Sequence, residues 1–195
     1  MASSAPDQLS PRAKQIVEIA RDLLEQEGLE ALTMRRLADR VGIRAPSLYK
    51  HFADKNALET ALISDGFVEL ADVFETATAD ADDPLAAIAA AYRNYAHTHP
   101  HLYRLMTERP LPREQLAAGV EDRTALPILQ ALGGDPDLAR AAWAFAHGMT
   151  NLELNQRFPP NANLDTAWKR GIDAFDQAAT ASSPKTPVRQ QRPRA

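Results

Sequence analysis

Residues 32–58 read LTMRRLADRVGIRAPSLYKHFADKNAL, and this stretch decides the fold. Thr33 suits a helix N-cap, and the eight residues after it carry an apolar stripe at helical spacing. Gly42 suits the turn that ends this helix, and Pro46 suits the first turn of a second helix of seven residues, ending at Phe52. A helix, a glycine turn and a helix in this order predict a helix-turn-helix.

The flanking sequence predicts further helices on both sides of this stretch. Ser10 and Pro11 begin a helix that we expect to end near Glu27, and Asp54 caps a long helix that runs to about Thr78. The composition agrees, because the chain has 36 Ala and only 8 Gly, and Ala is the strongest helix former. We therefore expect an all-α protein.

The C-terminal half is expected to form a helical bundle, which brings the total to about nine helices. Helices are predicted from Pro84 to about His97, from Pro100, and over 113–132, where Pro127 should kink or split the helix. The last two helices carry apolar residues three and four apart, as helices that pair in a bundle do.

Composition and charge exclude several classes of protein. The chain has no Cys, which excludes disulfide frameworks, Cys-ligated zinc and Cys nucleophiles. It has no apolar run of about 20 residues, and its N-terminus has no signal-peptide core, so we expect a cytoplasmic protein without membrane contact. The sequence has no Gly-x-Ser-x-Gly, P-loop, Gly-x-Gly-x-x-Gly or His-Glu-x-x-His motif, so we expect neither an enzyme nor a cofactor.

Positive charge gathers around the predicted helix-turn-helix, although the whole chain carries a net charge of −4. Residues 33–55 contain only two acidic side chains, Asp39 and Asp54. Their six cations are Arg35, Arg36, Arg40, Arg44, Lys50 and Lys55. A basic patch on an acidic protein is a possible footprint for nucleic acid. Charge alone leaves open an ordinary helical hairpin with a solvated face.

The residues of this stretch also resemble the DNA-binding domain of the tetracycline-repressor (TetR) family, over about residues 10–62. The resemblance rests on hydrophobic spacing, the turn glycine, Tyr49-x-His51-Phe52 and the following Lys55. It implies a homodimer that places two recognition helices in successive major grooves of a palindromic operator. The domains would be 10–55 for DNA binding and 56–181 for ligand binding and dimerisation. Residues 1–9 and the basic tail 182–195 are predicted to be disordered.

The family pattern assigns roles to ten residues of this chain. The residues implied to hold phosphates are Thr33, Tyr49, His51 and Lys55. Those implied to face base edges are Arg35, Arg44, Ala45, Ser47 and Lys50. Pro46 matches a position that contacts a thymine methyl. Arg44 departs from the small or acidic residue often found there, so the operator sequence cannot be copied from a relative.

The C-terminal half resembles the ligand-binding and dimerisation domain of the family more loosely. Residues 143–149, WAFAHGM, resemble the Trp-x-x-x-His-Gly signature of one subfamily. A small-molecule effector is implied, and the candidate contacts are Tyr92, Tyr95, Met106, Trp143, His147 and Asn151. Each could equally fill a bundle core. The implied dimer interface is Leu138, Ala142, Phe145, Met149, Leu152, Trp168, Ile172 and Phe175.

Two alternatives stay open at this point. His97, His99 and His101 could suggest a metal site, but their spacing is not the i, i+4 pair on one helix that zinc sites favour, so we expect no metal. The chain could also be a ligand-binding or protein-interaction dimer that lacks useful sequence-specific DNA binding. The intact residues Tyr49, Lys50, His51 and Lys55 argue against that alternative, so we expect a ligand-responsive repressor.

Overall fold

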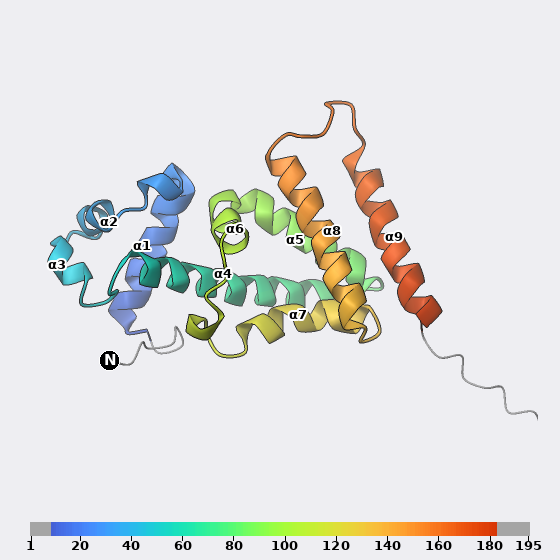
Figure 1. The fold of residues 1–195 in the computed structure, drawn as a ribbon, viewed down its shortest axis with the longest axis horizontal. Coiled ribbons are helices and arrows are strands. Elements are labelled where there is room, and N and C mark those ends of the chain that lie inside the picture. Colours follow the sequence, from blue (N-terminus) through green and yellow to red (C-terminus); the bar gives the residue numbers. More distant parts are fainter. Residues whose placement is uncertain (1–8, 183–195) are drawn as a thin grey trace, which may run out of the picture.

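The computed structural model describes residues 9–182, which form nine α-helices and two short 3-10 helices, with no strand in that range (Figure 1). This confirms the all-α prediction. The disorder predicted for both ends falls almost entirely on residues 1–8 and 183–195, which lie outside the described part of the chain.

The N-terminal helices form the predicted helix-turn-helix domain. They are α1 (Pro11–Glu27), α2 (Met34–Val41) and α3 (Ala45–Leu48). Thr33 caps α2, since its Oγ1 accepts a hydrogen bond from the backbone nitrogen of Arg36 at 3.2 Å. Gly42 ends α2 in the left-handed conformation at φ 74°, which glycine adopts without steric cost. Leu48 and Phe52 are buried in the hydrophobic core.

The recognition helix is shorter than the predicted seven residues, because α3 covers only four. The chain then continues in tighter turns, in which the backbone nitrogens of Lys50 and His51 donate to carbonyls three residues earlier, at 3.3 and 2.9 Å. Asp54 caps the next helix almost at once, so the chain must turn away from the α3 axis within a few residues. These turns still bring Phe52 into the core.

Helix α4 (Lys55–Thr78) is the longest described element and joins the two halves of the molecule. Figure 1 shows it running from the α1–α3 end toward α8, with α5 (Pro84–Thr98) and α6 (Pro100–Thr107) packed along it. Eleven of its residues are buried, so the helix is enclosed by its neighbours along most of its length. A stiff element of this kind can transmit a displacement between the two domains.

The helix predicted over 113–132 was wrong in its first third. Residues 113–115 form a 3-10 turn, and α7 begins only at Val120 and ends at Ala131. Gly119 breaks the run with φ at 73°, while the backbone nitrogen of Ala117 donates to Ser64 Oγ on α4 at 3.1 Å. Pro127 lies inside α7 without splitting it, although it removes one helical hydrogen bond.

The last two helices, α8 (Pro136–Leu154) and α9 (Leu164–Ser182), pair through aromatic contacts. The ring of Phe145 lies 5.6 Å from Trp168 and 5.8 Å from Phe175, between ring centres. Ala142, Trp168 and Ile172 are therefore buried within a single chain. Among residues 9–182 we find no helix with the length and apolar character needed to cross a membrane.

Candidate DNA-binding surface and its links to the C-terminal domain

Two arginines of the basic patch pair with residues of α1. Arg36 on α2 pairs with Glu27 at the end of α1, and Arg40 bonds both Glu27 and Gln26. These contacts fasten α2 to α1, so Arg36 and Arg40 are already engaged within the chain. Neither was among the predicted DNA contacts.

Three other cations of the basic patch are exposed and unpaired within the described part of the chain. Arg35 on α2, Arg44 before α3 and Lys50 after it are exposed, and none of the three makes an ion pair with another residue of the described range 9–182. Tyr49 lies among them with 51% of its surface exposed. We call these four residues and the first turn of α3 the α2–α3 surface. It presents unpaired positive charge and one exposed ring to a partner.

The N-terminal end of α3 carries several of the residues predicted to face base edges. Arg44 has an extended backbone at φ −77° and ψ 142° and stands just before Ala45, the first helical residue. Pro46 is exposed, while Ala45 and Ser47 are half-buried. Base edges are usually read from the N-terminal end of a recognition helix, so Arg44 has the position for a bidentate contact with guanine.

The predicted phosphate contacts flank this surface. Thr33 is exposed at the start of α2, and although its Oγ1 accepts the capping bond its hydroxyl proton stays available. His51 is half-buried after α3. Lys55, the first residue of α4, places its ammonium 3.5 Å from a carboxylate oxygen of Glu59. All ten predicted contact residues thus fall on one domain, between the start of α2 and the start of α4.

Comparison with known proteins gives this geometry a family. Residues 16–62 match the model for bacterial regulatory proteins of the tetR family, and residues 85–175 match the model for the tetracyclin repressor-like C-terminal domain. The uncharacterised HTH-type transcriptional regulator Rv0681 of Mycobacterium tuberculosis is 32% identical over 150 residues, which cover 71% of this chain and 68% of that protein. The chain belongs to the TetR family. It is a helix-turn-helix transcriptional regulator.

Solved structures agree with this TetR-family fold. A protein of unknown function from Rhodococcus sp. RHA1 is 27% identical with a TM-score of 0.67, over 89% of this chain and 97% of that one. A TetR variant from Acinetobacter baumannii, solved in complex with minocycline, is 24% identical with a TM-score of 0.61, over 86% and 96% of the two chains. At 24% identity this second likeness shows the fold alone.

Three of the predicted ligand contacts of this TetR-family chain lie in one hydrogen-bonded cluster. The Tyr92 hydroxyl donates to the Tyr103 hydroxyl at 3.1 Å, and the Tyr103 hydroxyl lies 2.7 Å from Nδ1 of His147. The Trp143 ring stacks on His147 with ring centres 6.1 Å apart. We call Tyr92, Tyr103, His147 and Trp143 the aromatic relay. It runs from the core, where Tyr92 is buried, to the surface, where half of Trp143 is exposed.

Burial fixes the protonation of this relay. It raises the pKa of the Tyr92 phenol far above its ordinary value, and it raises the pKa of Tyr103 to about 12. Burial also lowers the pKa of His147, against a smaller opposing effect of Glu108. At neutral pH both phenols therefore keep their protons, and a neutral His147 can accept a hydrogen bond at Nδ1.

The other predicted ligand contacts lie elsewhere. Tyr95 faces α4, where its hydroxyl donates to the Gly66 carbonyl at 3.2 Å, and Met106 also packs on Gly66. Asn151 is half-buried on α8, where it accepts from Asn155. The structure therefore brings together only part of the predicted pocket. A separate cavity of about 210 Å³ lies between α1 and α4, lined by residues such as Leu9, Val17 and Val68.

The three histidines of the α5–α6 junction turn to different partners. Nε2 of His97 lies 3.1 Å from Glu153 on α8, the ring of His99 packs on Tyr95, and His101 lies beside Gly28. No group of three or more candidate metal ligands occurs within the described range. The three side chains thus contact three different parts of the fold.

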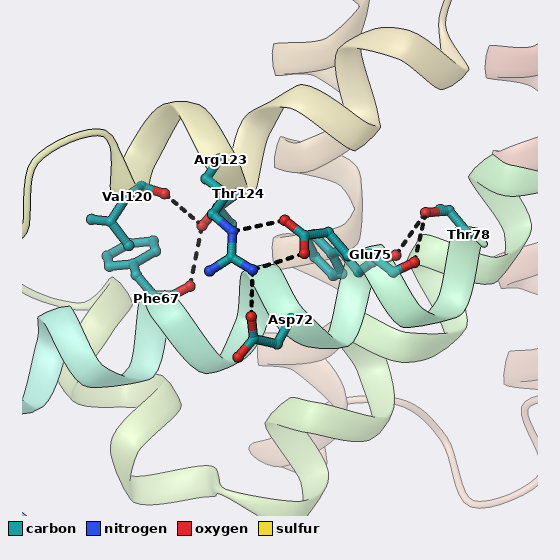
Figure 2. Close-up of polar contacts among 8 residues, drawn as sticks. Phe67, Asp72, Glu75, Thr78, Val120, Arg123 and Thr124 are labelled. Atoms are coloured by element: carbon teal, nitrogen blue, oxygen red, sulfur yellow. Dashed lines mark hydrogen bonds and ion pairs between the residues drawn. The ribbon is translucent and has the colours of Figure 1, made fainter.

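Helix α4 is tied to α7 along its C-terminal half (Figure 2). The Arg123 guanidinium donates two hydrogen bonds of 2.7 Å to the Glu75 carboxylate and also pairs with Asp72. Beside it, the Thr124 hydroxyl bonds the Phe67 carbonyl at 3.3 Å and the Val120 carbonyl at 2.9 Å. These contacts fasten α7 to α4, against which it also packs along its length.

Sequence reasoning missed two residues that organise the C-terminal domain. Tyr103 joins Tyr92 to His147, and Glu153 is a buried carboxylate that bonds Trp168, His97 and Arg93, with a distance of 2.8 Å to the Arg93 Nε. A phenol and a carboxylate within otherwise apolar helical patterns were the available signals, because buried polar groups require partners.

Proposed function

We propose that this TetR-family regulator binds a palindromic operator as a homodimer, represses transcription there, and is released by a small molecule. The observation that carries the proposal is that some cations of the basic patch are paired within the chain and others are not. Arg36 and Arg40 pair with side chains of α1. Arg35, Arg44 and Lys50, in contrast, make no ion pair within the described residues and lie around the first turn of α3. DNA would explain three unpaired cations on one face, because its phosphates and base edges would be their partners.

Dimerisation sets the geometry of the operator. Two recognition helices related by a two-fold axis read half-sites whose centres lie about 34–36 Å apart, one turn of B-DNA. We place the dimer interface on the outer faces of α8 and α9. Leu152 is exposed there and Met149 is half-buried, whereas Ala142, Trp168 and Ile172 support the helices from within.

The aromatic relay is the proposed contact region for the effector. It combines apolar rings with hydroxyl and imidazole groups, as small-molecule sites usually do. Trp143, His147 and Gly148 also support placing the C-terminal domain in the Trp-x-x-x-His-Gly subfamily. A ligand can shift the DNA-binding equilibrium only through its different affinity for the two dimer conformations. The tie between α4 and α7 gives such a shift a route to the α2–α3 surface.

Selection of bound duplexes from a random pool tests the proposal at about 0.15 M salt, near physiological ionic strength. We expect the full chain to enrich an inverted repeat with half-sites one turn apart. Equal recovery of scrambled sequences, with binding that disappears as salt rises, would contradict it. That result would leave only electrostatic affinity for DNA. Within a cell this activity belongs to the cytoplasm, where the operator DNA is.

A further inference from the structure

Glu59 is a buried carboxylate that lies between the two domains. It stands on α4 one turn after Lys55, and its side chain is only 6% exposed. Arg109, from the segment between α6 and α7, places Nη1 2.6 Å from Oε2 of Glu59. Lys55 places Nζ 3.5 Å from the other oxygen, Oε1. One anion thus faces one cation from the DNA-binding end and one from the C-terminal domain.

The two cations hold Glu59 unequally. The bond from Arg109 is short and charge-assisted, whereas Oε1 makes no hydrogen bond within residues 9–182. A buried carboxylate requires at least one counter-charge, because an unpaired charge away from water is strongly destabilising. While Arg109 supplies that charge, Lys55 is the cation that can leave.

We propose that Glu59 is a counter-ion shared between Lys55 and Arg109, and that its occupancy by Arg109 sets how freely Lys55 reaches a DNA phosphate. With Arg109 in place, Lys55 keeps only its 3.5 Å contact with Glu59 and can exchange that carboxylate for a DNA phosphate. When Arg109 is withdrawn, Glu59 retains Lys55 and the protein loses one phosphate contact per protomer. The proposal rests on the proposed operator binding, and it makes Glu59 and Arg109 positioning residues rather than DNA contacts.

The segment that carries Arg109 is placed to use this exchange. It follows α6 directly and returns to α4 at Ala117, whose backbone nitrogen bonds Ser64. Glu59 and Ser64 both lie in the first half of α4, on the side of the DNA-binding domain. A shift of α6 therefore reaches Lys55 through a single ion pair, without a change in the helix-turn-helix itself.

Titration of the enriched operator duplex with the full chain tests the exchange, at several salt concentrations between about 0.05 and 0.2 M. We expect Arg109→Gln to weaken binding about tenfold. We also expect it to lower the slope of log K against log salt by about 0.9 for each protomer, the value for one phosphate. Adding Glu59→Gln should restore both, because no carboxylate then holds Lys55.

Three comparisons separate this role from a structural one. Arg113→Gln, in the same segment, removes an exposed pair with Glu121 and should leave binding unchanged. In a Lys55→Gln background, Arg109→Gln should have no further effect. The proposal is overturned if the folded double variant Glu59→Gln, Arg109→Gln binds as weakly as Arg109→Gln alone, since Arg109 would then act on DNA or on the fold directly.

A DNA-independent readout distinguishes failure of the exchange from failure of the proposed function. If the wild-type chain enriches no operator, the proposed function fails, but acylation of the Lys55 amine can still be followed by mass spectrometry. We expect slower acylation of Lys55 in Arg109→Gln than in wild type, and recovery in the double variant. Equal rates in all three proteins would overturn the exchange whatever the DNA result.

Discussion

The carboxylate of Glu25 on α1 caps the first turn of α6 at Leu102, with Oε1 2.8 Å from the backbone nitrogen of that residue. Its Oε2 lies 3.3 Å from the backbone nitrogen of His101. No side chain of α6's own N-cap position bonds this turn, and Pro100 supplies no N–H. The N-terminus of a C-terminal-domain helix is thus completed by a residue of the DNA-binding domain, which makes α1 and α6 mechanically dependent on each other.

Removing this cap should destabilise the chain. We expect Glu25→Ala to lower the free energy of unfolding by about 1 kcal/mol, the usual cost of a lost capping side chain. Urea unfolding followed by circular dichroism measures it. Asp22→Ala, an exposed carboxylate on the same helix, is the matched control and should change stability by less than about 0.5 kcal/mol. Equal losses in the two variants would show that Glu25 contributes no cap.

Arg44 should carry base recognition. We expect Arg44→Ala to weaken binding to the selected operator by about 1–3 kcal/mol per half-site and to relax the preference at one base pair, since a bidentate contact with guanine is worth that much. Repeating the duplex selection with the variant measures both effects. Arg140→Ala removes an exposed arginine that pairs with Asp137 on α8 and should leave affinity and selectivity unchanged. Unaltered selectivity in Arg44→Ala would refute the assignment.

The sequence predicted the helices far better than the contacts between them. Local signals such as Thr33 and Gly42 act within a few residues, and the structure confirms their helix boundaries. The prediction of a helix from residue 113 was wrong because Gly119 adopts φ 73° and because the bond from Ala117 to Ser64 depends on packing against α4, which periodicity does not report. Helix propensity is overridden there by tertiary context.

The candidate site shows the same contrast between what the sequence predicts and what depends on contacts in space. The six cations near the turn were visible in the sequence, but neither charge nor spacing distinguished Arg36 and Arg40, which pair with residues of α1, from the unpaired Arg44. Only the family pattern left the first two out of the DNA contacts. That distinction depends on which acids lie opposite in space. Glu59, likewise, occupies an ordinary helical position and becomes notable only through its burial and its pair with Arg109.

The lowered pKa of His147 makes stability pH-dependent. The unfolded chain binds a proton to His147 below about pH 6.5, its ordinary pKa, whereas the folded chain does so only at lower pH. The unfolded state therefore gains protons first, and stability should fall as pH drops below about 6.5. Tyr103, the Trp143 ring and Glu108 are the groups that act on His147, and burial outweighs the charge of Glu108.

Urea unfolding midpoints at about pH 7.5 and pH 5.5 test whether His147 causes this pH dependence of stability. We expect His147→Gln to lose part of the drop in midpoint that the wild type shows between these pH values, because Gln cannot take up a proton. His51→Gln, on the helix-turn-helix, should keep the drop of the wild type. An unchanged drop in His147→Gln would assign the pH dependence to other groups.

The proposed dimer interface can be tested without disturbing the fold of one chain. Leu152 on α8 is 41% exposed and Leu126 on α7 is 49% exposed, so both should tolerate glutamate in an isolated chain. Only Leu152 belongs to the predicted interface, where a buried unpaired charge costs several kcal/mol. We expect Leu152→Glu to raise the dimer dissociation constant at least about 100-fold, which corresponds to about 2.7 kcal/mol. Sedimentation analysis should show this loss while Leu126→Glu stays dimeric. Dissociation by Leu126→Glu instead would move the interface from α8 to α7.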